Sequence, residues 1–166
     1  MAADAITSLK ADHREFRGLV REFKRTGPRA LKTKQKLANQ IIELLTVHTY
    51  IENEVMYASV RELLPALNED VLEAYEEHHV ADVLTAELAV MSPSDERYDA
   101  KAAVLFESVT HHIEEEEGDL FRKVRSGLSR KQLQELGAQL DEARLRAPRS
   151  PAQPSAMKKA LDAVLA

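Results

Sequence analysis

Residues 48–57 read HTYIENEVMY, and residues 112–121 read HIEEEEGDLF. Each stretch begins with a His, has a Glu four residues later, and ends in two large hydrophobic residues. A spacing of four residues places two side chains on the same face of an α-helix, one turn apart. The two histidines are 64 positions apart, an offset that an internal duplication of a helix pair would give. The repeat therefore predicts two helices that each present an imidazole and a carboxylate on one face.

Few helix-breaking residues interrupt the chain around these stretches. The 166 residues include only 5 Gly and 6 Pro and are 44% hydrophobic, which is typical of one helical globular domain. The breaks leave four helical segments, at about residues 3–25, 30–63, 69–91 and 96–126. Short connections favour antiparallel neighbours. We therefore predict an all-α fold, an up-down-up-down four-helix bundle.

The rest of the chain is expected to form a short C-terminal helical extension. KQLQELGAQLDEARL, at 131–145, is a candidate fifth helix, and APRSPAQP, at 147–154, reads as an extended linker before SAMKKALDAVLA. We expect the tail after residue 147 to be peripheral. The predicted division is thus residues 1–126 for the bundle and 127–166 for the extension and linker.

Composition and charge narrow the possible functions. The chain has no Cys, which excludes disulfides, thiolate zinc sites and iron–sulfur clusters, so that any metal must bind through His and carboxylate. A net charge of −5 argues against a nucleic-acid partner. Charged residues interrupt the N-terminal sequence where a signal peptide would be apolar, and no apolar run approaches the ~18 residues of a membrane span. We expect a soluble cytoplasmic protein without a membrane partner; the sequence does not specify a protein partner.

The six histidines are distributed so that every predicted helix carries at least one. In the first helix His13 lies within an apolar stripe that has the spacing of a buried face. His48 and Glu52 share such a stripe in the second helix, and His112 and Glu116 share one in the fourth. The stripes are Ile6, Leu9, His13, Phe16, Val20 and Phe23; Ile41, Leu45, His48, Glu52 and Val55; and Leu105, Val109, His112, Glu116 and Leu120.

Two inward carboxylates need a compensating charge. Burial of an ionised carboxylate without a partner costs several kcal/mol, so such groups are normally paired with cations or bind metal. The predicted interior stripes contain no Lys or Arg. A bound cation is therefore the expected counter-charge, and a metal-free bundle is the less favoured interpretation.

The third helix offers two adjacent histidines, His78 and His79, which point about 100° apart. Helical spacing around His78 meets only uncharged residues, whereas the same spacing around His79 meets Asp82. The offset from His13 to His78 is 65 residues, close to the 64 of the repeat. We therefore predict that His78 is the ligand and retain His79 as the second candidate.

His111 is a further candidate on the fourth helix. With Glu115 it forms a shifted copy of the repeated motif. The helical face that carries His111, however, also carries the charged residues Glu107 and Glu114. His112 and Glu116 are therefore preferred.

Four motifs together resemble those of the hemerythrin-like, HHE cation-binding family: DH at 12–13, HTYIENE at 48–54, EEHH at 76–79 and HHIEEEEGDLF at 111–121. The resemblance implies a four-helix bundle that holds two non-haem iron ions, bridged by two carboxylates and an oxo or hydroxo group. It implies these metal ligands: His13, His48, His78 and His112 as terminal ligands, with Glu52 and Glu116 as bridges. The ferritin-like pattern, Glu-x-x-His on two helices, fits only Glu76 and His79.

The sequence departs from the pattern of the oxygen-carrying hemerythrins, in which five His form the site. Ala74 and Tyr75 lie four residues before the two histidines of the third helix, where a carrier would have another His. Tyr75, Tyr57, a Glu from residues 114–117, or water are candidates for this coordination position. The resemblance implies a di-iron protein that handles dioxygen, peroxide (catalase-like) or nitric oxide. The competing hypothesis is an iron or oxygen sensor, or an iron-binding module, without turnover.

Overall fold

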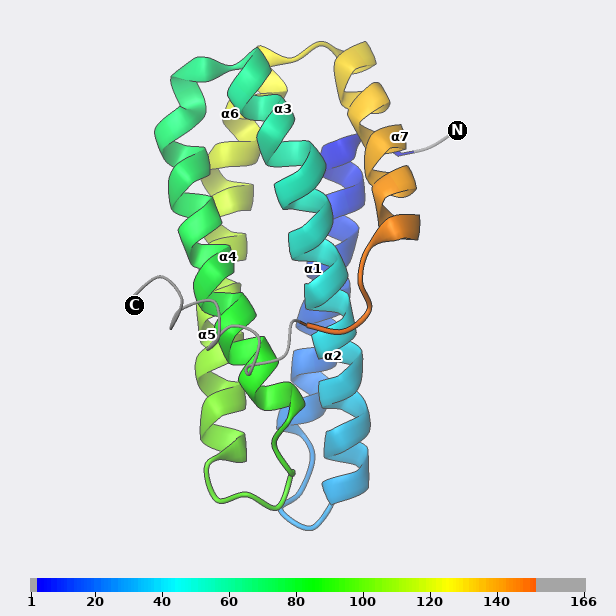
Figure 1. Ribbon diagram of the computed structural model, residues 1–166, viewed down its shortest axis with the longest axis vertical. Helices are drawn as coiled ribbons and strands as arrows, with labels where there is room; N and C mark the ends of the chain where they lie inside the picture. Colours follow the sequence, from blue (N-terminus) through cyan, green and yellow to red (C-terminus); the bar gives the residue numbers. More distant parts are fainter. Residues whose placement is uncertain (1–2, 152–166) are drawn as a thin grey trace, which may run out of the picture.

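Four bundle helices run side by side and antiparallel in the computed structural model, which describes residues 3–151 (Figure 1). The first is α1 (Ala5–Lys24), and the third is α4 (Asn68–Ala89). The second bundle helix consists of α2 (Leu31–Ile51), η1 (Glu52–Tyr57) and α3 (Ala58–Leu63), and the fourth of α5 (Tyr98–Glu115), η3 (Glu116–Leu120) and α6 (Phe121–Gly127). A short 3₁₀ turn, η2 (Pro65–Leu67), precedes α4. The predicted all-α, up-down-up-down bundle is confirmed.

Local sequence signals explain where the first helix begins and how it faces the core. The Asp4 carboxylate caps α1 by accepting a hydrogen bond from the Thr7 N–H at 2.9 Å. The helix ends at Lys24, before Gly27 and Pro28.

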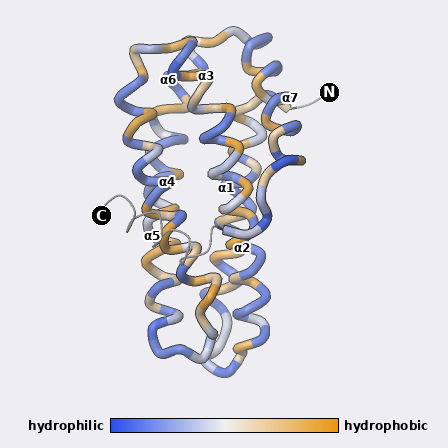
Figure 2. Tube along the Cα trace, viewed as in Figure 1, coloured by the Kyte–Doolittle hydropathy of each residue, from blue (hydrophilic) through white to orange (hydrophobic). Residues whose placement is uncertain are grey.

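Hydrophobic and hydrophilic residues alternate with the helical period along each bundle helix (Figure 2). Among the described residues, no helix has an apolar stretch long enough to cross a membrane.

The interior contains two hydrophobic clusters with polar side chains between them. One cluster includes Leu9, Ile51 and Leu120, and the other includes Phe16 and Leu105. A set of buried polar side chains lies between the clusters, and we call it the polar layer: His13, His48, Glu52, His78, His112 and Glu116. Apolar side chains thus shield the polar layer from water at both ends of the bundle.

The fifth helix, α7 (Arg130–Arg146), lies along the outside of the bundle against α1, α2 and η1 (Figure 1). It begins with a capping box, in which Ser129 and Gln132 each accept a hydrogen bond from the backbone N–H of the other. A Cβ on Gly137 would lie 2.1 Å from the Ala3 carbonyl oxygen, so only Gly permits this approach. The structure thus has a helix within the predicted extension; the segment SAMKKALDAVLA lies outside the described residues.

Two π-helical turns interrupt the regular helices, and helical periodicity does not reveal them. They are η1, which begins at Glu52, and η3, which begins at Glu116. A π turn inserts an extra residue into a helix and shifts the direction of every side chain after it. As a consequence, Tyr57 and Phe121, each five residues after its Glu, point back into the core.

Candidate metal centre

The six side chains of the polar layer converge from all four bundle helices. Glu52 Oε2 lies 3.2 Å from His48 Nε2 and 3.1 Å from His78 Nε2. Glu116 Oε2 lies 3.3 Å from His13 Nε2 and 3.7 Å from His112 Nε2. Each Glu is thus close to two imidazoles from different helices. None of the six residues is more than 7% exposed.

Two groups of potential ligand atoms can be distinguished within the polar layer. His13, His48, Glu52 and Glu116 each offer one atom, and these atoms lie within 4.8 Å of one another. Glu52, His78 and His112 form a second group that meets the same limit. Glu52 belongs to both groups, so its two oxygens could serve two ions. The structure thus brings together all six preferred candidates.

Several polar atoms of the layer lack the hydrogen bonds that buried groups normally make. Within residues 3–151, His13 Nε2, His48 Nε2, Glu52 Oε1 and Glu116 Oε2 have no hydrogen-bond partner. These four residues are the members of the first group just described. Bound cations would satisfy them, and imidazole nitrogen with carboxylate oxygen is a donor set that suits iron, zinc, manganese or cobalt. The residues present therefore fit a metal centre.

Tyr57 is a seventh side chain at the centre. Its ring is fully buried, and its hydroxyl donates a hydrogen bond to Glu116 Oε1 at 2.9 Å. The hydroxyl oxygen also lies 3.2 Å from His78 Nε2 and 3.4 Å from His112 Nε2. Burial, together with the charges of Glu116 and Glu52, raises the pKa of Tyr57 well above its usual range, so the metal-free protein keeps this phenol protonated.

Four side chains with ligand chemistry lie outside the polar layer. The Tyr75 hydroxyl bonds to the Asn53 carbonyl oxygen at 3.3 Å. His79 is exposed on α4. His111 is also exposed and pairs with Glu115 at 3.1 Å on the surface. The structure therefore separates Tyr75, His79, and the His111–Glu115 pair from the polar layer.

Each imidazole directs Nε2 toward the centre and is held through Nδ1 by a second side chain. A histidine ligand normally has such an outer hydrogen bond, which fixes its tautomer and ring orientation. The outer acceptors are Glu117 Oε1 for His13 at 2.8 Å, Asp12 Oδ2 for His48 at 3.0 Å, Asn53 Oδ1 for His78 at 2.8 Å, and Glu77 Oε2 for His112.

These outer acceptors could not be predicted from the sequence. Glu117 and Asp12 lie beside the core stripes, and their role depends on a neighbouring helix. Helical register alone predicts that Glu117, one residue beyond Glu116, is dispensable, but its carboxylate holds His13. The DH pair at 12–13 and the Glu run at 114–117 carry the relevant residues, yet only a three-dimensional structure shows their contacts.

Arginine residues support two of the outer acceptors. Arg17 contacts the Glu117 carboxylate with both terminal nitrogens at 3.3 Å. Arg144 of α7 contacts the Asp12 carboxylate at 3.2 and 3.1 Å. Burial alone would raise the pKa of Asp12, but His48 and Arg144 outweigh it and hold that pKa below the usual range. The fifth helix is therefore connected to His48 through one carboxylate.

The electrostatics of the metal-free centre favour a protonated imidazole. Burial opposes a charge on His48, but Glu52 and Asp12 outweigh burial and raise its pKa to about 10. Burial alone would raise the pKa of Glu52, but His48 and His78 hold that pKa well below its usual range. A metal ion bound at His48 must therefore displace a proton.

A cavity of about 20 Å³ adjoins the centre on the side of the second hydrophobic cluster. Its walls include all four imidazoles of the polar layer and the apolar side chains of Phe16, Leu44, Leu45, Ala81, Val109 and Ile113. About 10–15 Å³ of such volume holds one water. The cavity therefore has room for a molecule of only a few atoms.

Comparisons with known proteins identify the family and agree with the fold. Residues 4–124 match the family model described as the hemerythrin HHE cation binding domain. A solved structure of a hemerythrin HHE cation binding domain-containing protein from Mycobacterium kansasii superimposes with a TM-score of 0.72 at 21% identity, over 86% of this chain and 88% of that one. A protein from Nostoc sp. named DNA nickase is 27% identical over 137 residues. That match covers 82% of this chain but spans only 38% of the relative's length.

Proposed function

Because this chain belongs to the hemerythrin HHE cation-binding domain family, we propose that its polar layer binds two iron ions and handles dioxygen, peroxide or nitric oxide. The observation that carries the proposal is the set of four buried, unpaired donor atoms that three of the bundle helices supply within the described residues. A pair of iron ions, bridged by an oxo or hydroxo group, would supply two-electron redox chemistry.

The distances support a division of the ligands between two ions. His13 and His48 would bind one ion, while His78 and His112 would bind the other, because the last two Nε2 atoms are 3.1 Å apart. Glu52 and Glu116 would bridge. Tyr57 lies nearest the second pair, so its oxygen would be a further ligand for that ion.

The size of the adjoining cavity supports a small substrate. At about 20 Å³ and with apolar walls, it would admit a diatomic gas or hydrogen peroxide and exclude an organic metabolite. Tyr57 holds a phenolic proton beside Glu52 and Glu116, and metal binding at this oxygen would release it. Catalase-like peroxide turnover is therefore our preferred activity.

A sensor without turnover is the second candidate, and the contact of Arg144 with Asp12 favours it. Asp12 bonds to His48, so a change in metal occupancy at His48 could be transmitted to α7 on the outside of the bundle. Metal-dependent binding of a partner protein, without peroxide turnover, would distinguish the sensor.

Metal analysis and optical spectroscopy of protein purified anaerobically, before and after exposure to oxygen, test the proposal. We expect close to two iron ions per chain, an oxo-bridged di-ferric absorption after oxygen, and oxygen release from added peroxide. A single zinc ion without a second site would refute the di-iron proposal. A long-lived oxygenated complex that returns to the di-ferrous state under vacuum, without peroxide turnover, would instead support a carrier.

A further inference from the structure

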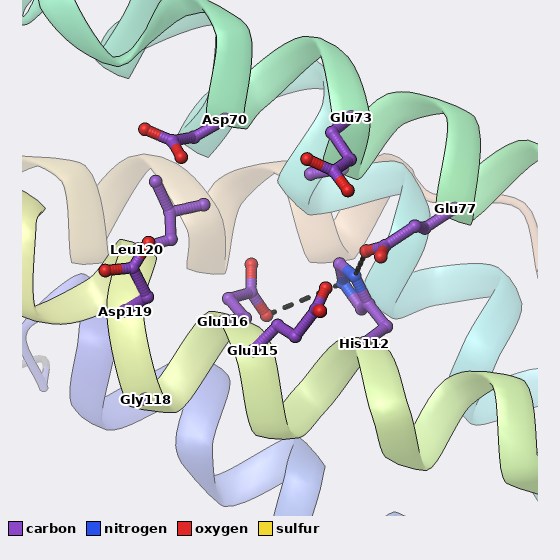
Figure 3. Close-up of a pocket in the computed structure, with 10 residues that line it drawn as sticks. Asp70, Glu73, Glu77, His112, Glu115, Glu116, Gly118, Asp119 and Leu120 are labelled. Atoms are coloured by element: carbon purple, nitrogen blue, oxygen red, sulfur yellow. Dashed lines mark hydrogen bonds and ion pairs between the residues drawn. The ribbon is translucent and has the colours of Figure 1, made fainter.

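A cleft of about 260 Å³ lies between α4 and the α5–η3 segment, and it leads from the surface to the polar layer (Figure 3). His112 and Glu116 form its inner end, and both are buried. Glu115 and Asp119 line it nearer the surface, with side chains 51% and 60% exposed. The cleft therefore connects solvent with two of the candidate ligands.

Carboxylates dominate the walls of this cleft. They come from Asp70, Glu73 and Glu77 on α4 and from Glu115, Glu116 and Asp119 on the fourth bundle helix. Lys123 pairs with Asp70 at 3.3 Å and with Asp119 at 2.8 Å, so one end is partly neutralised. Within residues 3–151, the four remaining carboxylates form no ion pair with Lys or Arg. The cleft thus favours cations.

The other cavities near the centre are poor paths for a hydrated cation. The groove on the other side of η3 has Lys10, Arg17, Arg122 and Arg125 among its walls, which repel positive charge. The apolar cavity of about 20 Å³ is too small for an ion with its water shell. The acidic cleft is large enough for a hydrated cation, and its carboxylates attract positive charge.

A cluster of possible ligands lies at the edge of the cleft, where Glu77 and Glu115 are part of the wall and His111 adjoins Glu115. Glu77, His111 and Glu115 each offer one atom, and these atoms lie within 4.8 Å of one another. At the inner end, Glu116 Oε2 is buried and has no hydrogen-bond partner within the described residues. Figure 3 shows the Glu77 carboxylate at His112 and the Glu115 carboxylate beside it. An ion bound at the cluster would thus be a short step from the centre.

We propose that divalent cations reach the centre through this acidic cleft and that Glu77, His111 and Glu115 form a separate, weaker cation site on the way. The inference rests on the proposed metal centre. A cleft of one charge sign concentrates counter-ions and raises association rates, in general 10- to 10³-fold. Exposed carboxylates are screened by salt, so the rate of uptake through the cleft falls as ionic strength rises.

The uptake rate of Co²⁺ by apoprotein tests the route, because visible absorption follows the ion into a His and carboxylate site. The double variant Glu73→Gln/Glu115→Gln removes two charges from the cleft. Glu107→Gln/Glu114→Gln removes two charges from α5 outside the cleft and is the control. We expect uptake to slow roughly tenfold or more in the cleft variant and to lose most of its salt dependence. The final content of the centre should stay at two ions per chain in both variants.

The outcomes separate this inference from the proposed function. Equal rates and equal salt dependence in the cleft variant and the wild type would overturn the route but leave the centre intact. A wild type that takes up no Co²⁺ would overturn the centre and, with it, the route.

The outer cation site is tested on the iron-loaded protein with Mn²⁺, whose bound and free forms differ in electron paramagnetic resonance. We expect one weakly bound Mn²⁺ per chain in the wild type. It should be lost in His111→Ala and retained in His79→Ala, because His79 is also exposed but is not a member of this cluster. No bound Mn²⁺ in the wild type, or equal binding in the two variants, would overturn the outer site.

Discussion

The Tyr57 hydroxyl lies within 3.4 Å of both carboxylates of the polar layer and of two imidazoles, and these contacts all involve a single oxygen atom. A phenol can donate a proton or, once deprotonated, provide an anionic oxygen to a ferric ion. Loss of the hydroxyl with retention of the ring would separate these chemical roles from packing.

Replacement of Tyr57 by Phe should keep the fold and impair the chemistry. We expect Tyr57→Phe to lose the visible band of a ferric phenolate and to lower peroxide turnover, because an oxygen ligand of the centre is removed. Absorption spectroscopy and an oxygen electrode provide the measurements. Tyr75→Phe is the control, since the Tyr75 hydroxyl bonds to a backbone carbonyl away from the centre. Retention of the band in Tyr57→Phe would contradict the assignment.

Replacement of the two Glu residues of the polar layer should affect iron binding more than replacement of a neighbouring, exposed Glu. We expect Glu52→Ala and Glu116→Ala to lose iron or to uncouple the two ions, and Glu54→Ala, at an exposed position, to have little effect. Glu117→Ala should weaken metal binding roughly 10- to 100-fold, because Glu117 orients His13. Iron content and magnetic susceptibility report these changes. Equal iron loss in Glu54→Ala and Glu52→Ala would show that the buried face has been misassigned.

At the scale of secondary-structure elements, helical periodicity predicted the buried faces well. Every residue of the apolar stripes in the first, second and fourth bundle helices is buried, and so is His78 in the third. Burial in a four-helix bundle follows the helical period, so one sequence is sufficient for this inference. The preference for His78 over His79 agrees with burial, although its role as a ligand stays a prediction.

The same periodicity could not predict which side chains the π turns and the neighbouring helices bring to the polar layer. Tyr57 follows Glu52 by five residues, whereas regular helical spacing places a same-face residue at three or four. Asp12 and Glu77 act through side chains of other helices, so their function depends on packing. The repeated pairs Met56-Tyr57 and Leu120-Phe121 are visible in the sequence, but only the structure shows that their second members enter the core.

The fifth helix should influence metal binding through one residue. Arg144→Met removes the two contacts to Asp12, and we expect metal release to a chelator to become roughly tenfold faster, because Asp12 orients His48. Circular dichroism should show unchanged helix content. Arg146→Met is the matched control, because Arg146 pairs with Glu142 on the same helix. Equal release rates in the two variants would show that α7 has no effect on the centre.

For the whole molecule, the polar layer divides the core into two hydrophobic clusters. In the metal-free protein, this division leaves charged and unpaired groups in the middle of the described part of the bundle. Bound cations would compensate them and would link the two clusters through ligands from every bundle helix. The stability of the fold should therefore depend on metal.

Removal of the metal should lower the thermal unfolding midpoint. A ligand that binds only the native state stabilises it by about 4 kcal/mol at a thousand times its dissociation constant. We expect calorimetry to show a clear decrease in the midpoint after anaerobic chelation and recovery when Fe²⁺ is added. An apoprotein with the same midpoint as the loaded protein would argue that the buried carboxylates are compensated without metal.

Tyr57 ends η1 and Phe121 follows η3, so each lies five residues after the Glu that begins its π turn, yet only Tyr57 has a hydroxyl. Phe121 instead stacks on the His13 ring, with centroids 5.8 Å apart and planes at 2°. If two iron ions bind, the phenol oxygen would make the ion near His78 the more easily oxidised one. A protein reduced by one electron would then localise that electron on the ion held by His13 and His48. The two halves of the repeat would thus have different redox potentials, and Mössbauer spectra should resolve two iron sites.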